Sequence, residues 1–203
     1  MSKTIEKLKN YVPFCSQEEG DKNYFIKSEQ KEQILTRENK NCHLTASAFI
    51  INKEHNKVLS VFHNIYNSWS LPGGHADGID DMLFVSKKEA NEETGIKKLR
   101  LLKKTPISID SLTTDSHFKN NKFVPAHIHL NFCYLFETDE NQKLTVKKDE
   151  NSLVKWLEFN KLLDGAWEPQ MKRVYQKIIE KIELFFKGKL NDWRKQKRIY
   201  KDL

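Results

Sequence analysis

Three glutamates lie close together just before a glycine near the middle of the 203-residue chain. Glu89, Glu92 and Glu93 precede Gly95, and spacings of three and four residues place their side chains on one face of a helix. Like charges crowded on one face repel each other, so the pattern favours a bound cation. Carboxylate oxygens suit a hard divalent ion. We therefore expect Mg²⁺ (or Mn²⁺) as the cofactor.

The sequence around these glutamates resembles the Nudix box, G-x5-E-x7-R-E-U-x-E-E-x-G-U, in which U is a bulky apolar residue. The match spans residues 74–96, and the preceding segment WSLPGG at 69–74 is similar to the usual lead-in of that family. Two positions differ from the box consensus but keep its charges: Asp80 replaces a glutamate and Lys88 replaces an arginine. The resemblance covers about residues 42–165 and explains neither end of the chain.

The resemblance implies a hydrolase that cleaves a phosphoanhydride bond in a nucleoside diphosphate linked to another moiety. Divalent ions neutralise such a linkage and lower the pKa of bound water, and a carboxylate can accept the proton. The metal ligands that the resemblance implies are the carbonyl of Gly73 and the carboxylates of Asp80, Glu89, Glu92 and Glu93.

The same resemblance assigns catalytic roles to Glu89, Glu92, Glu93 and Lys88. Asp80 matches a glutamate that reaches the metals through water, although its side chain is one methylene shorter. Lys88 stands where an arginine fixes the catalytic glutamate by an ion pair. Lysine keeps the charge but loses the planar two-point contact, so we expect weaker positioning with activity retained.

Four histidines could add to this site. His75 follows the paired glycines, His43 opens an apolar run, and His127 and His129 share one side of a strand. One interpretation has His75, His127 and His129 binding substrate, with the last two contacting phosphate or base or assisting a metal. The other makes the histidines partly buried residues bonded to backbone, and we favour it for His43.

The residues after the box offer further candidates. Many relatives use an acidic residue from a later loop, and Glu150 is a candidate for substrate binding, with Asp149 beside it. An ordinary charged loop is an equal alternative. The polar segment 115–123 is long enough to act as a lid or specificity loop.

These residues need a scaffold of alternating elements. Apolar runs predict strands at residues 44–52, 57–63, 69–71, 99–102, 107–109, 127–136 and 153–158. Helical patterns occur at residues 3–10, about 18–39, 81–94, from 158 to 163, and from 169 to about 193. This order predicts an α/β fold with a mixed sheet between helices, and the resemblance implies a Nudix-like α/β/α sandwich.

We expect three parts in the chain. Residues 1–41 form an N-terminal helical extension, 42–165 the catalytic domain, and 166–203 a basic amphipathic helix packed on that domain. The net charge of +7 resides in the tail, because residues 171–203 hold eleven Lys or Arg against four Asp or Glu. We favour the interpretation that these charges lie on a solvated helix face. The more specific alternative is a surface that binds RNA.

Composition restricts the remaining possibilities. The sequence has no apolar run long enough for a membrane span, so we expect no membrane partner. Three widely spaced cysteines form no metal-type pair, which indicates a reducing cytoplasm. A small nucleotide-type diphosphate is the expected partner, with a monomer or homodimer as the assembly. The alternative function is a catalytically weak Nudix-fold module that binds nucleotide or RNA.

Overall fold

A mixed β-sheet forms the centre of the protein. The structure is a computed structural model that describes residues 3–28, 33–119 and 121–188. The sheet runs in the order β10-β2-β1-β9-β5, with β3 on β2, β4 on β1 and β6 on β9. Its strands are β1 (Cys42–Ile51), β2 (Lys57–His63), β3 (Ser68–Ser70), β4 (Gly73–His75), β5 (Arg100–Leu101), β6 (Ser108–Thr114), β9 (His127–Glu137) and β10 (Asn151–Glu158). β1 and β9 are parallel, whereas the other pairs are antiparallel.

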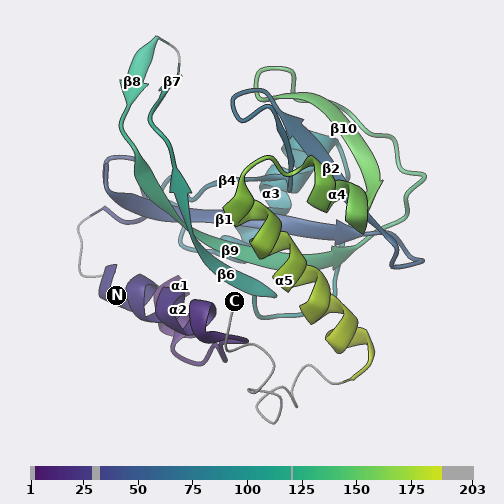
Figure 1. Cartoon of the computed structure of the whole chain (residues 1–203), viewed down its shortest axis with the longest axis horizontal. Helices are drawn as coiled ribbons and strands as arrows, with labels where there is room; N and C mark the ends of the chain where they lie inside the picture. The colour runs from purple at the N-terminus through teal and green to yellow at the C-terminus, as the bar shows by residue number, and fades with distance from the viewer. Residues whose placement is uncertain (1–2, 29–32, 120, 189–203) are drawn as a thin grey trace.

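Helices cover both faces of this sheet. α4 and α5 lie in front of it and α3 behind it, while α1 and α2 lie together beside β6 (Figure 1). A separate hairpin of β7 and β8 projects from the body (Figure 1). The bounds are α1 (Lys3–Leu8), α2 (Ser16–Ser28), α3 (Met82–Thr94), α4 (Phe159–Gly165), α5 (Pro169–Phe186), β7 (His117–Lys119) and β8 (Lys122–Val124). The layers form the α/β/α sandwich predicted from the sequence.

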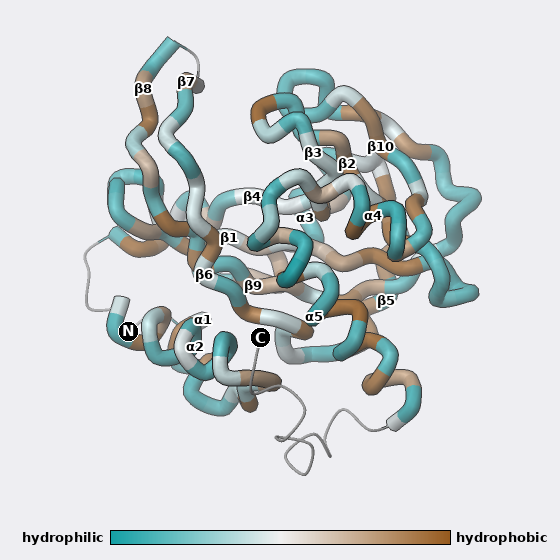
Figure 2. The backbone as a smooth tube through the Cα atoms, in the orientation of Figure 1, coloured by the Kyte–Doolittle hydropathy of each residue, from teal (hydrophilic) through white to brown (hydrophobic). Residues whose placement is uncertain are grey.

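The two faces of β1 build two cores. Ala46, Ala48 and Ile50 pack with residues of α1, α2 and α3, whereas Phe49 and Ile51 pack with α4 and α5. This follows from the two-residue side-chain period of a strand. Hydrophobic stretches accordingly follow the central strands and α5, and the loops at the rim are mostly hydrophilic (Figure 2).

Local signals fix the ends of the box helix α3. The side chain of Asp81 accepts hydrogen bonds from the backbone N–H groups of Leu83 and Phe84, both at 3.1 Å, and so caps the N-terminus. Gly95 ends the helix at φ 76°, a left-handed conformation that glycine adopts without strain. These ends confirm the helix predicted for 81–94.

The N-terminal segment is joined to α5 by a buried ion network. Glu18 on α2 accepts a hydrogen bond from Lys181 at 2.6 Å and lies 3.4 Å from Lys177. Lys177 also contacts Asp110 of β6 at 2.6 Å. All four side chains are buried, so the network ties three distant segments together.

Several predicted elements differ from the observed ones. α2 ends at Ser28, well before the predicted end near 39, and residues 33–39 form turns. The segment 115–123, predicted as a loop, contains β7 and β8. α5 ends at Phe186, and the rest of the predicted helix, with most of the basic tail, lies from 189 onward, outside the described residues. The division into 1–41, 42–165 and 166–203 stays a prediction.

Within the part of the chain that the structure describes, none of the helices combines the length and apolar character that crossing a bilayer requires.

Candidate active site

The paired glycines allow two close approaches at the centre of the site. Gly73 and Gly74 on β4 pair with Ser47 and Ala46 of β1. A Cβ added at Gly73 would lie 2.6 Å from the carbonyl oxygen of Ala46, and one at Gly74 would lie 2.5 Å from Cδ of Glu89. Glycine is therefore required for β4 to lie against both β1 and the box helix.

Glu93 is the most buried of the box carboxylates, with 3 % of its surface exposed. Its Oε1 accepts a hydrogen bond from the backbone N–H of Gly73 at 3.1 Å, and its Oε2 accepts one from Nδ2 of Asn151 at 2.9 Å. Burial, together with the nearby negative charges of Glu150 and Glu89, outweighs these bonds and raises the pKa of Glu93 to about 7. Its negative charge thus lacks full compensation.

Lys88 connects the other two glutamates. Its Nζ donates to Oε1 of Glu89 at 2.9 Å and to Oε2 of Glu92 at 3.2 Å. Glu89 is buried, whereas the Glu92 side chain is 41 % exposed. One ammonium group therefore contacts both carboxylates; the sequence predicted an ion pair of Lys88 with the catalytic glutamate alone.

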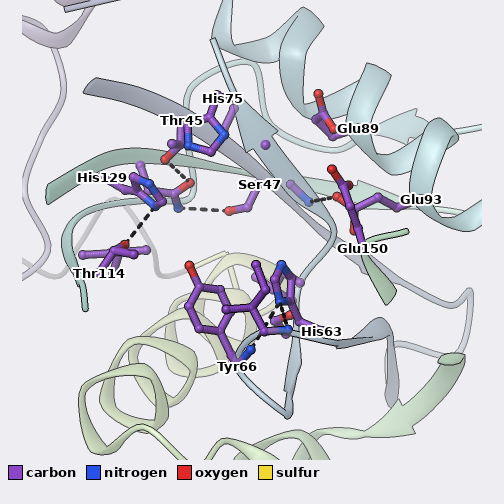
Figure 3. Close-up of a pocket in the computed structure, with 18 of the residues that line it drawn as sticks. Thr45, Ser47, His63, Tyr66, His75, Glu89, Glu93, Thr114, His129 and Glu150 are labelled. Carbon is purple, nitrogen blue, oxygen red and sulfur yellow. Dashed lines mark hydrogen bonds between the residues drawn. The ribbon is translucent and has the colours of Figure 1, made fainter. Parts of the chain in front are cut away.

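A cavity of about 510 Å³ opens beside this group. Its wall contains more acidic than basic residues: the acidic ones are Asp77, Glu89, Glu92, Glu93, Asp149, Glu150 and Glu168, and the basic ones are Arg37, Lys88 and Lys147. Figure 3 shows Glu89, Glu93 and Glu150 on one side of the cavity, with His75 and His129 on the opposite side. The cavity is large enough for a small organic ligand.

The floor of the cavity is a polar stretch of β1 and β9. Asn131 accepts a hydrogen bond from Thr45 at 3.2 Å and donates one to Ser47 at 3.0 Å (Figure 3). Further along the strands, the same sheet face becomes apolar and packs under α5. The cavity therefore lies where the polar end of the sheet face is left uncovered.

Four histidines lie on three strands at the far side of the cavity, where His75 and His129 line its wall. His43, His75, His127 and His129 place one ring nitrogen each within 4.8 Å of the others. Burial lowers the pKa of His43, and burial together with the neighbouring histidines lowers the pKa of His129 to about 2. These two rings are therefore neutral near pH 7.

The structure brings most of the predicted site residues into one cavity. It is lined by Gly73, His75, Lys88, Glu89, Glu92, Glu93, His129 and Glu150. His127 lines an adjoining cavity of about 190 Å³ instead.

The placement of Asp80 differs from its predicted place among the metal ligands. Its carboxylate accepts hydrogen bonds from the backbone N–H groups of Lys3 at 2.6 Å and Thr4 at 3.1 Å. It thereby holds the first turn of α1 and does not line the cavity. The short aspartate side chain is directed to α1 because unpaired N–H groups at a helix start attract a carboxylate.

Two features of the site were missed in the sequence. Asn151, fully buried, contacts Glu93 from the start of β10, and only the pairing of β10 with β2 brings it there. Arg37 forms an ion pair with Asp77 at the cavity rim, and nothing in its local sequence marks it. Trp69 packs against the apolar core, and Phe118 of the hairpin lines the cavity.

The chain matches the NUDIX domain family over residues 42–178. It therefore belongs to this family, as the box predicted. Within the family it is a hydrolase of the pyrophosphohydrolase type.

Individual relatives are distant. A probable DHNTP pyrophosphohydrolase from Lactococcus lactis subsp. cremoris is 26 % identical over 138 residues, which is 68 % of this chain and 80 % of the relative. An Ap4A hydrolase from C. elegans, solved as a binary complex, superposes with a TM-score of 0.54 at 19 % identity, covering 71 % of this chain and 98 % of that one. A NUDIX-family hydrolase from Clostridium perfringens gives 0.50 at 22 %, covering 68 % and 96 %. These two structures support the fold.

Proposed function

We propose that this protein uses a divalent cation, Mg²⁺ or Mn²⁺, to hydrolyse a phosphoanhydride bond in a nucleoside diphosphate linked to another moiety. The observation that carries the proposal is the buried carboxylate of Glu93, whose hydrogen-bond donors Gly73 and Asn151 are both neutral. Glu93 lies beside Glu89 and Glu150, and these like charges help to raise its pKa. A hard cation would neutralise such a group, so the residues present fit the metal that the family implies.

Glu89, Glu92 and Glu93 would hold the cation, together with the carbonyl of Gly73. When bound, the cation supplies charge neutralisation for the phosphates and a lowered pKa for the attacking water. Lys88 orients Glu89 and Glu92 through its two hydrogen bonds. Glu89 would accept the proton of the water through Oε2, since Lys88 donates to its Oε1.

Substrate would occupy the cavity between the acidic wall and the histidines. Arg37 and Lys147 at its wall offer positive charge to phosphate oxygens. Contacts of His75, His127, His129 and Glu150 with substrate remain part of this proposal. The name of the Lactococcus relative adds DHNTP to the compounds worth testing, beside nucleoside triphosphates, nucleotide sugars and dinucleoside polyphosphates.

A panel of these compounds, assayed for phosphate or nucleotide release with Mg²⁺ and with Mn²⁺, tests the proposal. We expect turnover of at least one compound that requires the cation and is lost in Glu92→Gln. Nucleotide binding without turnover of any compound would favour the alternative, a Nudix-fold binding module. Oligomeric state, RNA binding and a cytoplasmic location stay predictions.

A further inference from the structure

Four histidines from three strands converge beside the cavity, and we call His43, His75, His127 and His129 the histidine cluster. Nε2 of His127 lies 2.9 Å from Nε2 of His129, and the ring of His43 lies 5.0 to 5.1 Å from each of the other three rings. The register produces this, because His43 stands beside His129 in the parallel pair and Thr45 stands opposite His75.

Backbone carbonyls fix the tautomers of two of these rings. Nδ1 of His43 lies 3.1 Å from the carbonyl oxygen of Asn39, and Nδ1 of His127 lies 2.8 Å from that of Pro125. A carbonyl oxygen only accepts, so each Nδ1 must carry the proton. Each neutral ring therefore presents an Nε2 lone pair. Metal-binding histidines are held in the same way, with the second nitrogen bonded to a carbonyl or carboxylate.

The Nε2 of His43 has no hydrogen-bond partner among the described residues, although the residue is only 4 % exposed. A buried polar atom without a partner costs free energy. His129 adds a second nitrogen at the same place, since its Nδ1 lies 3.3 Å from Oγ1 of Thr114 while its Nε2 faces His127. With its proton on Nδ1, His127 accepts at Nε2 from Nε2 of His129. The ring nitrogens thus meet in one small volume, where the Nε2 of His43 is left without a donor among the described residues.

We propose that the histidine cluster binds one Zn²⁺ ion, at a site separate from the carboxylates of the box. Four imidazoles match the nitrogen preference of zinc and its tetrahedral coordination. Bonds of about 2.1 Å place tetrahedral ligands about 3.3 Å apart. The nitrogens lie within 4.8 Å of one another, so modest side-chain rotations would close the site.

The surroundings distinguish this site from the acidic one. Among described residues, those lining the smaller cavity at the cluster include no carboxylate, so a hard ion such as Mg²⁺ finds none of its preferred carboxylate ligands there. His75 belongs to β4, the strand that also carries Gly73 and Gly74. Zinc would therefore crosslink β1, β4 and β9 and hold the paired glycines in place under the box helix.

Metal titration of the chelator-treated full-length chain tests the proposal. We expect one Zn²⁺ per chain, bound in the presence of excess Mg²⁺, and a tetrahedral d–d spectrum when Co²⁺ is used instead. The double variant His43→Gln/His127→Gln should retain less than about a tenth of the bound metal. The control His55→Gln removes a histidine outside the cluster and should bind as the wild type does. Unchanged zinc binding by the double variant would overturn the proposal.

Two further measurements keep the test decisive. Anomalous diffraction from zinc-soaked wild-type crystals should show a peak among the four rings, even if the double variant fails to fold. A peak at the box carboxylates alone, or no peak, would refute the site. Glu92→Gln should still bind zinc at the cluster, so loss of the proposed hydrolysis and loss of the zinc site give separate results.

Discussion

Two buried glutamates in this protein have opposite electrostatic surroundings. Glu18 receives hydrogen bonds from Lys181, Tyr11 and the backbone N–H of Phe14. Although burial opposes ionisation, the charges of Lys181 and Lys177 lower the pKa of Glu18 to about 2. Glu93 is buried to a similar extent, yet burial and its acidic neighbours raise its pKa to about 7.

We interpret Glu18 as a structural charge and propose that Glu93 is a functional one. The protein neutralises Glu18 with its own lysines, so this carboxylate needs nothing from solution. Within the described part of the chain, Glu93 receives hydrogen bonds from two neutral donors, Gly73 and Asn151, and its charge could be balanced by a cation. A buried carboxylate is therefore not by itself a candidate for a functional site, whereas a buried carboxylate without a countercharge is.

Replacing Glu93 should give the largest effect on activity. We expect Glu93→Gln to lower kcat about 10³-fold, since one negative ligand of the proposed cation is lost. Without metal, the variant should be at least as stable as the wild type at pH 8, because a neutral amide avoids ionising a buried acid. Steady-state kinetics and thermal unfolding measure both effects. The exposed control Glu158→Gln should change neither, and a fully active Glu93→Gln would refute the comparison.

Replacing Glu18 should act on stability instead. We expect Glu18→Gln to lower the free energy of unfolding by about 3 kcal/mol, because two buried lysines lose their shared carboxylate. Urea unfolding measures this change. Glu19→Gln, at an exposed neighbouring position of α2, is the matched control and should stay within about 0.5 kcal/mol of the wild type. A similarly small change for Glu18→Gln would show that the buried ion network does not contribute to the free energy of unfolding.

The two glutamates should also give opposite pH dependences. The lowered pKa of Glu18 contributes stability above pH 4.5, and this contribution is lost as the pH falls from there towards about 2. Between pH 5 and pH 3 we expect a loss of about 2 kcal/mol. Glu93 acts the other way in metal-free protein, since its raised pKa makes stability fall between pH 4.5 and about 7. Unfolding curves at pH 3, 5 and 8 should show a shallower acid limb in Glu18→Gln.

We expect Asn151 to position the carboxylate of Glu93. Its replacement therefore tests whether the surroundings of Glu93, unlike those of Glu18, affect catalysis. Asn151→Ala removes one of the two donors to Glu93 and should lower kcat about tenfold. It should also move the acid limb of the pH–rate profile to higher pH, because the ionised carboxylate loses a hydrogen bond. An unchanged profile with lower stability would indicate a purely structural role. Asn64→Ala, at a rim position bonded to Lys148, serves as the control.

Lys88→Arg should have the smallest effect. The planar guanidinium can contact Glu89 and Glu92 together, so we expect an increase in kcat/KM within about threefold. Lys88→Ala should lower kcat/KM, which shows that the position matters. Equal kinetics for all three proteins would mean that this contact does not orient the carboxylates.

The features that could be predicted from the sequence are those whose signals lie within a single segment. The box helix is bounded by a side-chain cap and a left-handed glycine, and both signals lie within the segment itself. Its three glutamates reach one cavity because their spacing already places them on one face. The two glycines could be recognised as essential from the motif, although the contacts that require them, with Ala46 and Glu89, appear only in the fold.

Residues whose role depends on long-range pairing could not be predicted. Asn151 meets Glu93 because β10 pairs with β2, and no local pattern encodes that meeting. Asp80 occupies a box position but bonds to α1, a segment that lies outside the motif. Segment 115–123 was expected to be a loop because it is polar, but the pairing of His117 with Val124 makes it a hairpin.

The parallel pairing of β1 with β9 has a kinetic consequence. Thr45 and Asn131 are neighbours in space but 86 positions apart along the polypeptide, and the same register brings His43 beside His129. Closing so long a loop is entropically costly and slow. The imidazoles of His43 and His129 therefore meet only after β9 has paired with β1, so that zinc capture would report the completion of this pairing.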